Sequence, residues 1–264
     1  CGGRYVACSD PSAPTSGDFF PSVKFQPDDT GVLDAVHLDS DHIAVLPAQC
    51  TTLMQNTYCT ADRERRKAEC LAQSDAITPD QIPDVDCGLY HLAGLLYGDF
   101  PNELIPALSK KGKVSADIQG FLRHNENGLM NFHDWKDKLT YLPYFDFLKT
   151  DAAEAELLTG LTDRRAAAKQ LYEWGAKEIL ISHNSEMLVY DGKDYYTCPV
   201  KARNLSGRTG RGATPFGAYL AKRMMGVSIP AAQPFATDAV SLQMVSPGPL
   251  QRHETAVIAA SKEL

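Results

Sequence analysis

The chain lacks any uninterrupted apolar run of the roughly 20 residues that a membrane-spanning helix needs. Its most apolar stretch, Leu89 to Tyr97, contains a histidine and a glycine and is flanked by two more glycines. No basic segment near the start leads into an apolar one, as it would in a secretory signal peptide. These absences predict a protein with no membrane partner.

Basic residues are too few and too scattered to form a track for nucleic acid. The chain has 26 Lys and Arg against 33 Asp and Glu, which gives a net charge of −7. The densest basic run, Arg63 to Lys67, contains Glu64 and is followed by Glu69, as in a solvated surface. Nucleic-acid binders usually carry a basic stripe, so we expect no nucleic-acid partner.

The sequence also lacks the cysteine and histidine spacing of a zinc site. Its 7 cysteines include no CxxC pair and accompany no paired histidines. An odd number of scattered cysteines is typical of reduced thiols, which predicts a cytoplasmic protein.

What the sequence does contain is an alternation of strand and helix patterns. With 264 residues and 44% hydrophobic content, the chain can bury one sizeable core, so a single domain over residues 1–264 is expected. The predicted strands are 87–94, 113–119, 145–150 and 178–183, and the predicted helices are 102–110, 131–144, 151–159 and 164–174. Such alternation predicts an α/β fold with a doubly wound, mostly parallel sheet.

The two ends of the chain follow other patterns. After the alternating region, the turn signal Asp191-Gly192 predicts a hairpin of strands 187–190 and 194–200, and two helices follow at 213–225 and 231–245. Residues 1–30 are rich in Pro, Ser, Asp and Gly, which predicts loop or weak strand. Residues 51–58 read as a strand with a polar face.

Glycines gather just before the first of these closing helices. Gly207, Gly210 and Gly212 lead directly into the helix predicted from residue 213. Glycine lets the backbone approach a ligand closely, and the start of a helix offers unpaired N–H groups to an anion. From the glycines alone, a loop that merely caps the helix is the favoured interpretation. No GxxxxGK[ST] sequence exists in the chain, so the loop is not a Walker P-loop.

Thr209-Gly210-Arg211-Gly212-Ala213 resembles the closing signature D-T-x-G-A-G-D of the ribokinase (PfkB) family of carbohydrate kinases. In that family the glycine N–H groups form an anion hole for the transferred phosphoryl group. The terminal Asp accepts the proton of the attacking sugar hydroxyl. The resemblance therefore implies catalytic positions at Gly210, Arg211, Gly212 and 213, with Ala213 in place of the family's base.

A second segment resembles the family's N-x-x-E-x-E-x-x-T-G element, which helps to place magnesium and phosphate. It runs from Asp151 to Gly160, with Asp151 in place of Asn and Glu154 at the family's glutamate. The resemblance implies that Asp151 and Glu154 serve a Mg²⁺ ion. Two acidic residues at a helix start also suit the helix dipole, so a purely structural role is the alternative.

Weaker matches complete the resemblance. Asp117, Gln119 and Arg123 resemble a D-x-N strand end with a following Arg, and Gly2-Gly3 resembles the Gly-Gly of the sugar site. These five residues are the expected substrate residues. Residues 235–244, followed by Pro-Gly-Pro, resemble the helix that borders the adenine pocket. The implied nucleotide-binding residues are Ser182, Asn184, Lys149, Thr209 and Thr237.

The resemblance covers residues 45–250, and only about 30 to 40 residues precede it, where the family has a long βαβ region. We therefore expect an incomplete N-terminal region that is irregular before Val32, and a small β lid at 50–66 that offers a homodimer surface. The implied reaction is phosphoryl transfer from ATP, with Mg²⁺, to a hydroxyl of a sugar or nucleoside. Ala213 implies that this form is inactive or impaired.

Three alternatives stay open. The first is a non-catalytic pseudokinase that binds nucleotide or sugar without turnover, and the second is an active parent kinase in which Ala213 was engineered. The third, a Rossmann-type dehydrogenase, ranks low because no G-x-G-x-x-G follows an early strand.

Overall fold

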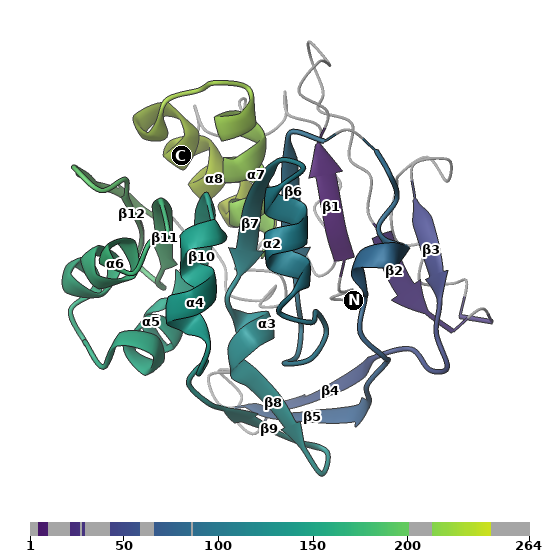
Figure 1. Cartoon of the computed structure of the whole chain (residues 1–264). Helices are drawn as coiled ribbons and strands as arrows, with labels where there is room; N and C mark the ends of the chain where they lie inside the picture. Colours follow the sequence, from purple (N-terminus) through teal and green to yellow (C-terminus); the bar gives the residue numbers. More distant parts are fainter. Residues whose placement is uncertain are drawn as a thin grey trace.

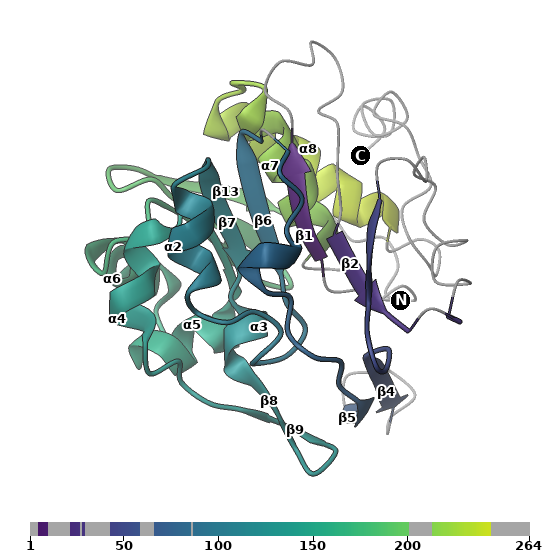
Figure 2. The same ribbon diagram turned by 45° about the vertical axis from the view of Figure 1, so that its right-hand side comes forward.

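A nine-stranded sheet crosses the centre of the molecule, with helices on both of its faces (Figure 1, Figure 2). The computed structural model describes residues 5–9, 22–26, 28–29, 43–58, 66–85, 87–200 and 213–243. The strand order is β13-β12-β11-β10-β7-β6-β1-β2-β3. These strands are β1 (Tyr5–Ser9), β2 (Ser22–Phe25), β3 (Ala44–Pro47), β6 (Leu89–Ala93), β7 (Lys113–Asp117), β10 (Phe147–Asp151), β11 (Glu178–Ser182), β12 (Glu186–Tyr190) and β13 (Tyr195–Pro199).

The centre of the sheet is parallel, and antiparallel pairs adjoin it on both sides. Strands β6, β7, β10 and β11 pair in parallel, whereas β12 and β13 on one side and β1 on the other pair antiparallel with their neighbours. Parallel strands that are covered on both faces read as continuous apolar runs, and this is why their positions were predicted well. The structure confirms the predicted α/β fold.

Two apolar cores lie on opposite faces of the sheet. One core packs α2 (Leu104–Ser109), α5 (Ala152–Thr159) and α6 (Arg164–Glu173) against the sheet through residues such as Leu108, Leu158 and Leu171. The other packs α7 (Ala213–Met224) and α8 (Ile229–Gln243) through residues such as Phe216 and Ala236. Because side chains alternate along a strand, β6, β10 and β11 each contribute to both cores.

The helix boundaries follow local signals in the sequence. The side chain of Asp151 accepts a hydrogen bond from the N–H of Glu154 at the start of α5, and Asp163 accepts one from the N–H of Ala166 in α6. Gly160 and Gly175 follow the two helices with φ of 73° and 111°. Such left-handed backbone favours glycine, so these helices end where the sequence predicts.

A second sheet of four strands, hereafter the lid, lies beside the main sheet (Figure 1). It consists of β4 (Leu53–Tyr58), β5 (Arg66–Ala72), β9 (Leu129–Phe132) and β8 (Arg123–Glu126), in that order. The lid is larger than the segment 50–66 that the sequence indicated, because β8 and β9 join it from a distant part of the chain. Asn127 and Gly128, with φ of 53° and 88°, form the tight turn between them.

The predicted helix 131–144 is wrong in the structure. Its first residues belong to β9, and only α4 (Lys138–Tyr141) and the 3-10 turn η3 (Leu142–Tyr144) are helical. The helical pattern was overridden because β9 forms a hairpin with β8, in which Asn131 and Phe132 lie opposite His124 and Arg123. A short helix α3 (Gln119–Leu122) links β7 to the lid, and the 3-10 turn η2 (Pro79–Gln81) follows β5.

Before Val32 we expected a fragmentary, irregular or discontinuous segment, and the residues described there, 5–9, 22–26 and 28–29, include two regular strands. Strands β1 and β2 are regular members of the main sheet, and β1 pairs with β6 over five residues, from Tyr5 opposite Ala93 to Ser9 opposite Leu89. The buried Lys24 of β2 donates a 2.8 Å hydrogen bond to the carbonyl of Ala76. This segment is therefore tied into the core.

The cysteines do not all match the prediction of reduced thiols. Cys87 is disulfide-bonded, whereas Cys50, Cys70 and Cys198 are free. Disulfides are rare in cytoplasmic proteins, so Cys87 weighs against the basis of the cytoplasmic assignment, which stays a prediction. Among the described residues, no helix combines the length and apolar character needed to span a bilayer.

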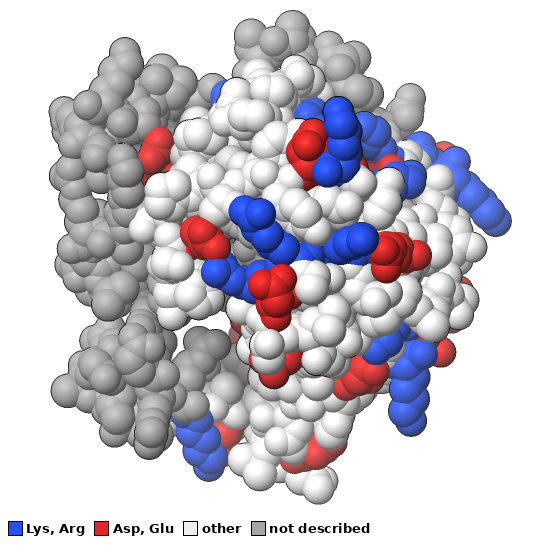
Figure 3. Space-filling view, turned by 90° about the vertical axis from the view of Figure 1, so that its left-hand side faces the viewer, with Lys and Arg blue, Asp and Glu red and all other residues white. Residues whose placement is uncertain are grey.

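Charged side chains of both signs are intermixed on the face shown in Figure 3. Ion pairs join basic and acidic residues of neighbouring elements, as between Arg164 and Glu186 at 2.7 Å and between Lys177 and Asp146 at 2.7 Å. At these pairs, charge of one sign is neutralised locally by charge of the other.

Candidate active site

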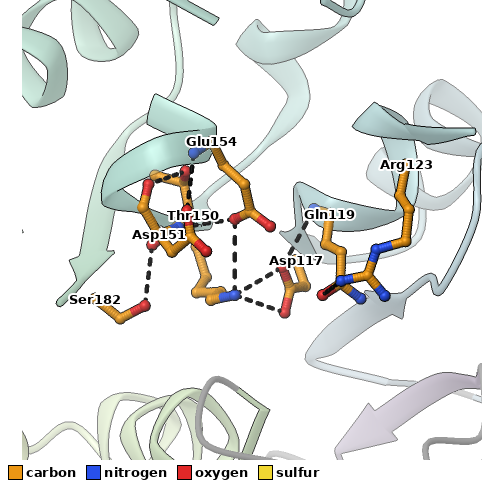
Figure 4. A network of polar contacts seen from close by, with 8 residues as sticks. Asp117, Gln119, Arg123, Thr150, Asp151, Glu154 and Ser182 are labelled. Carbon is orange, nitrogen blue, oxygen red and sulfur yellow. Dashed lines mark hydrogen bonds and ion pairs between the residues drawn. The ribbon is translucent and has the colours of Figure 1, made fainter. Parts of the chain in front are cut away.

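The site begins at the carboxyl ends of the parallel strands, where polar side chains replace apolar ones. Lys149 on β10 lies opposite Asp117 on β7 in the sheet register. Its Nζ donates to both carboxylate oxygens of Asp117 at 3.0 Å, and both side chains are largely buried (Figure 4). Open α/β sheets bind ligands at this edge, so this ion pair marks the candidate site.

The next residues on β10 bring a second carboxylate to Lys149. Asp151 and Glu154 bond reciprocally, since each side chain accepts the backbone N–H of the other at 2.8 Å. This capping box turns Glu154 back toward the sheet, where its Oε2 lies 3.9 Å from the Nζ of Lys149 (Figure 4). Lys149 therefore lies between two acidic side chains.

Burial and neighbouring charges shift the pKa values of this cluster. Burial raises the pKa of Glu154 to about 7, and the charges of Asp117 and Asp151 act in the same direction against the pull of Lys149. Burial alone would lower the pKa of Lys149, but Asp117 and Glu154 reverse that effect and raise it. Lys149 therefore stays charged at neutral pH.

The cluster fits a hard cation that also binds phosphate. Asp117, Asp151 and Glu154 carry more negative charge than Lys149 balances, and Asp151 and Glu154 each use only one oxygen in the capping box. Within the described ranges, no group of three His, Cys, Asp or Glu side chains could hold a metal alone. Magnesium usually keeps water ligands and adds phosphate oxygens, so these two carboxylates suit it.

The start of α7 reaches the same region of the sheet. Ala213, the first residue of α7, is exposed, and Phe216 one turn later is buried with its ring 5.3 Å from His91 on β6. His91 bonds to Ser115 at 3.0 Å, and Ser115 lies two residues before Asp117 on the same face of β7. A continuous set of contacts thus links the helix start to the Asp117–Lys149 pair.

The expected substrate residues Gln119 and Arg123 lie at the two ends of α3. The guanidinium Nη2 of Arg123 donates to Oε1 of Gln119 at 2.5 Å, and the N–H of Gln119 donates to Asp117 at 3.3 Å (Figure 4). Helix α3 can approach β6 only because Gly94 and Gly120 meet there. A Cβ on Gly120 would lie 2.6 Å from Cα of Gly94.

The expected nucleotide-binding residues are more widely spread. Ser182 on β11 donates to the carbonyl of Thr150 at 3.4 Å, beside Asp151, whereas Asn184 is exposed in the turn to β12. Thr237 on α8 is only 3% exposed, and its hydroxyl bonds to the carbonyl of Pro234 and the thiol of Cys198. Ser182 therefore lies in the cluster, while Thr237 faces the protein interior.

Several predicted site residues cannot be placed. Gly2, Gly3, Thr209, Gly210, Arg211 and Gly212 lie outside the described residues, and their roles stay predictions.

Sequence reasoning missed His91 and Ser115, which lie between α7 and Asp117. Burial lowers the pKa of His91 to about 4, so its ring is neutral at pH 7. The available signal was a histidine inside an apolar strand, which is also common in ordinary cores.

Comparison with known proteins identifies relatives over most of the chain, although no protein-family profile matches it. A pyrophosphate-dependent kinase in the ribokinase family, solved as a sulfate complex and with a pyrophosphate analog and myo-inositol, is 34% identical. The match covers 89% of this chain and 84% of that chain, with a TM-score of 0.81. Ribokinase from Arabidopsis thaliana, solved with ribose and ATP, is 15% identical with a TM-score of 0.70 over 90% of this chain and 80% of that one, and shares the fold.

A curated relative matches only locally. Cytidine kinase from Thermococcus kodakarensis is 37% identical over 71 residues, which are 26% of this chain and 26% of that protein. The more extensive match, to a kinase that is 34% identical over 89% of this chain and 84% of that one, carries the assignment. The chain therefore belongs to the ribokinase family of kinases.

Proposed function

We propose that the protein transfers a phosphoryl group from ATP to a hydroxyl of a sugar or similar polyol, slowly in the form with Ala213. The observation that carries this proposal is the Lys149–Asp117–Glu154 cluster at the carboxyl edge of the parallel strands. Phosphoryl transfer depends on positioning and charge stabilisation more than on covalent chemistry, and this edge offers both kinds of group.

Each part of the site has a role in this proposal. Asp151 and Glu154 would hold Mg²⁺, which supplies positive charge to the phosphate oxygens of the donor. Lys149 stays protonated in its acidic surroundings and would contact the donor phosphates. Backbone N–H groups at the start of α7, through Arg211, Gly212 and Ala213, would bind the transferred group. Asp117, Gln119 and Arg123 would orient the acceptor.

The donor has a second candidate, inorganic pyrophosphate. Solved kinases that share 32–34% of their residues with this chain are pyrophosphate-dependent. In addition, Thr237, expected beside an adenine ring, is buried against Cys198, so its hydroxyl is not presented to a ligand in this conformation. Both observations favour a phosphoryl donor that has no adenine, such as pyrophosphate. ATP bound to family members in other solved structures supports the first candidate.

The acceptor of choice for a first test is a neutral cyclic polyol. The relatives named above were solved with myo-inositol and with ribose. The test is product formation, followed by phosphorus NMR and mass spectrometry, with ATP or pyrophosphate against myo-inositol, ribose, fructose and cytidine. A phosphorylated polyol with either donor supports the proposal. Binding without product in both this form and Ala213→Asp would instead favour the pseudokinase.

We also propose that the lid forms a homodimer interface. Leu71 on β5 and Leu129 on β9 lie on one face of the lid, since Leu129 is opposite Glu69, and they are 56% and 48% exposed. Exposed apolar residues on one sheet are unusual unless a partner covers them. Sedimentation of the protein should give a dimer, and Leu71→Asp with Leu129→Asp should give a monomer. A monomeric wild type would refute this arrangement.

A further inference from the structure

Tyr97 extends from a rigid turn between β6 and α2. Gly98 has φ of +90°, which favours glycine, and the carboxylate of the fully buried Asp99 accepts the N–H groups of Leu95 and Leu96 at 2.8 and 3.0 Å. The carbonyl of Asp99 also accepts the N–H of Ile77 at 2.9 Å. The turn is thus fixed to the main domain, and so is the backbone of Tyr97.

The backbone of Tyr97 holds the lid on two sides. Its N–H donates to the carbonyl of Arg123, the first residue of β8, at 2.7 Å. Its carbonyl accepts from the side-chain amide of Gln73, just beyond β5, at 3.1 Å. The Gln73 oxygen in turn accepts from Asn125 on β8 at 3.4 Å. The place where the chain leaves lid strand β5 and the place where it enters lid strand β8 are therefore joined at this one residue.

The ring of Tyr97 adds a third contact with the lid. It stacks on His124 with ring centroids 4.2 Å apart and planes at 16°, although Tyr97 is 41% exposed. The ring of His133 meets the ring of His124 edge-on, with ring centroids 4.9 Å apart, and the Nε2 of His133 lies 2.6 Å from Oε1 of Glu126. An exposed aromatic ring that is held in this way connects the lid to the main domain.

This connection bears directly on the acceptor site. Arg123, whose carbonyl bonds to Tyr97, directs its guanidinium to Gln119 beside Asp117, and its neighbour His124 carries the stacked ring. A change in the position of β8 would therefore move Arg123 relative to Asp117. We infer that Tyr97 and His124 are positioning residues that set the lid, and with it Arg123, over the acceptor. The inference rests on the proposed function for the nature of that ligand.

The test compares two substitutions of Tyr97 with a matched control. Tyr97→Leu removes the stacked ring, Tyr97→Phe keeps it, and Tyr144→Leu removes a tyrosine of similar exposure (38%) on η3. Aromatic pairs contribute free energies that correspond to roughly 2- to 10-fold in an equilibrium constant. Hydrogen exchange of peptides 66–73 and 123–133, without ligand, should therefore become about 2- to 10-fold faster in Tyr97→Leu only.

Ligand binding supplies the readout that a merely structural role would leave unchanged. By calorimetry, the Kd for myo-inositol or ribose should rise about 2- to 10-fold in Tyr97→Leu, while the Kd for pyrophosphate or ATP stays constant. Tyr97→Phe and Tyr144→Leu should match the wild type in both. Equal hydrogen exchange and equal acceptor Kd in all four proteins would overturn the inference. Faster exchange in every peptide of the Tyr97→Leu protein, rather than in the lid peptides alone, would also overturn it.

The proposed function can fail separately. If the wild type binds no acceptor and forms no product, while Tyr97→Leu still accelerates exchange in the lid peptides alone, the function is wrong and the connection stands. If the wild type forms product and the Tyr97→Leu variant shows neither local exchange nor a changed acceptor Kd, the function stands and the inference is wrong.

Discussion

The ammonium group of Lys149 lies 3.0 Å from both carboxylate oxygens of Asp117, its register partner on the neighbouring strand. Both groups are buried, and each lies at or near the last residue of a parallel strand. The pair fixes the spacing of β7 and β10 at the edge where the site is built. It also holds a positive charge in place without a bound phosphate.

We predict that removing one partner of this pair is costly. Lys149→Met should lower the free energy of unfolding by about 3–5 kcal/mol, because it leaves the Asp117 carboxylate buried and unpaired. The double variant Lys149→Met with Asp117→Asn should recover most of that loss. Urea unfolding of the single and double variants measures the coupling.

The exposed pair of Lys177 and Asp146 provides the control. Its atoms are 2.7 Å apart, but the Lys177 side chain is 62% exposed. Lys177→Met should cost less than about 1 kcal/mol. If Lys149→Met costs no more than this control, the buried pair does not support the site as described.

Stability should depend on pH through His91. Burial lowers the pKa of His91 from 6.5 to about 4 in the folded protein. Between these two pH values the unfolded chain binds a proton that the folded protein does not bind. The contribution of His91 to the free energy of unfolding is therefore fully present above pH 6.5 and is lost as the pH falls toward 4. It amounts to about 3 kcal/mol.

His91→Gln should remove that dependence, since Gln does not titrate. The free energy of unfolding, measured by denaturant between pH 4 and 7, should then fall less steeply with acid than in the wild type. His183→Gln, at an exposed position, should leave the wild-type slope unchanged. An identical slope in His91→Gln and the wild type would contradict the assignment.

The helices and strands from residue 87 to 200 were largely predictable because local signals mark them. Gly160 and Gly175 end their helices in left-handed backbone, and Asp151 and Asp163 cap the helix starts, so propensity and tertiary structure agree. The lid was not predictable to the same degree. Strand β9 pairs with β8 through the Asn127-Gly128 turn, a hairpin signal that the prediction of a helix passed over. The pairing of this hairpin with β5, at Leu129 opposite Glu69, joins residues 60 apart in the chain, and local propensity carries no information on such a partner.

The site shows the same division. Asp117 and Lys149 stand near the ends of separate apolar runs, so each was a candidate from its position. Their contact depends on β7 and β10 being neighbours, which only the sheet order establishes. His91 and Ser115 were missed because a polar residue inside an apolar strand has no local pattern that separates a site from a satisfied core.

We predict that the contact between Gly94 and Gly120 tolerates no side chain. A Cβ at Gly120 would lie 2.6 Å from Cα of Gly94, and one at Gly94 would lie 2.8 Å from Cα of Gly120. Gly120→Ala should therefore lower the free energy of unfolding by about 1–3 kcal/mol and displace α3. Because α3 carries Gln119 and leads to Arg123, acceptor affinity should also fall.

Gly217→Ala is the matched control for this substitution. Gly217 lies within α7, and no atom is within 4 Å of its expected Cβ. The change should raise the free energy of unfolding by up to about 1 kcal/mol, since alanine is the better helix former. Equal effects of the two substitutions would show that the backbone near Gly94 can give way.

The last prediction concerns Ala213, the first residue of α7. A positioned carboxylate that accepts the proton of an attacking hydroxyl typically contributes about 10²- to 10⁴-fold to the rate. Alanine has no such group, and the next side chain, Thr214, is a poor base. The N–H groups of the helix start do not depend on this side chain. Ala213→Asp should therefore raise kcat by about 10²- to 10⁴-fold, while the Kd of the donor changes little.

The measurement is product formation with ATP and with pyrophosphate, alongside donor Kd by calorimetry. Ala213→Asn is the control, because it adds a side chain of similar size that accepts no proton at neutral pH, and it should stay as slow as the wild type. Equal turnover in the wild type and Ala213→Asp would place the proton acceptor elsewhere in the site. The buried Asp117, which is paired with Lys149, is then the carboxylate to test. The variant Asp117→Asn, made in the wild type and in Ala213→Asp, shows whether it accepts the proton of the hydroxyl.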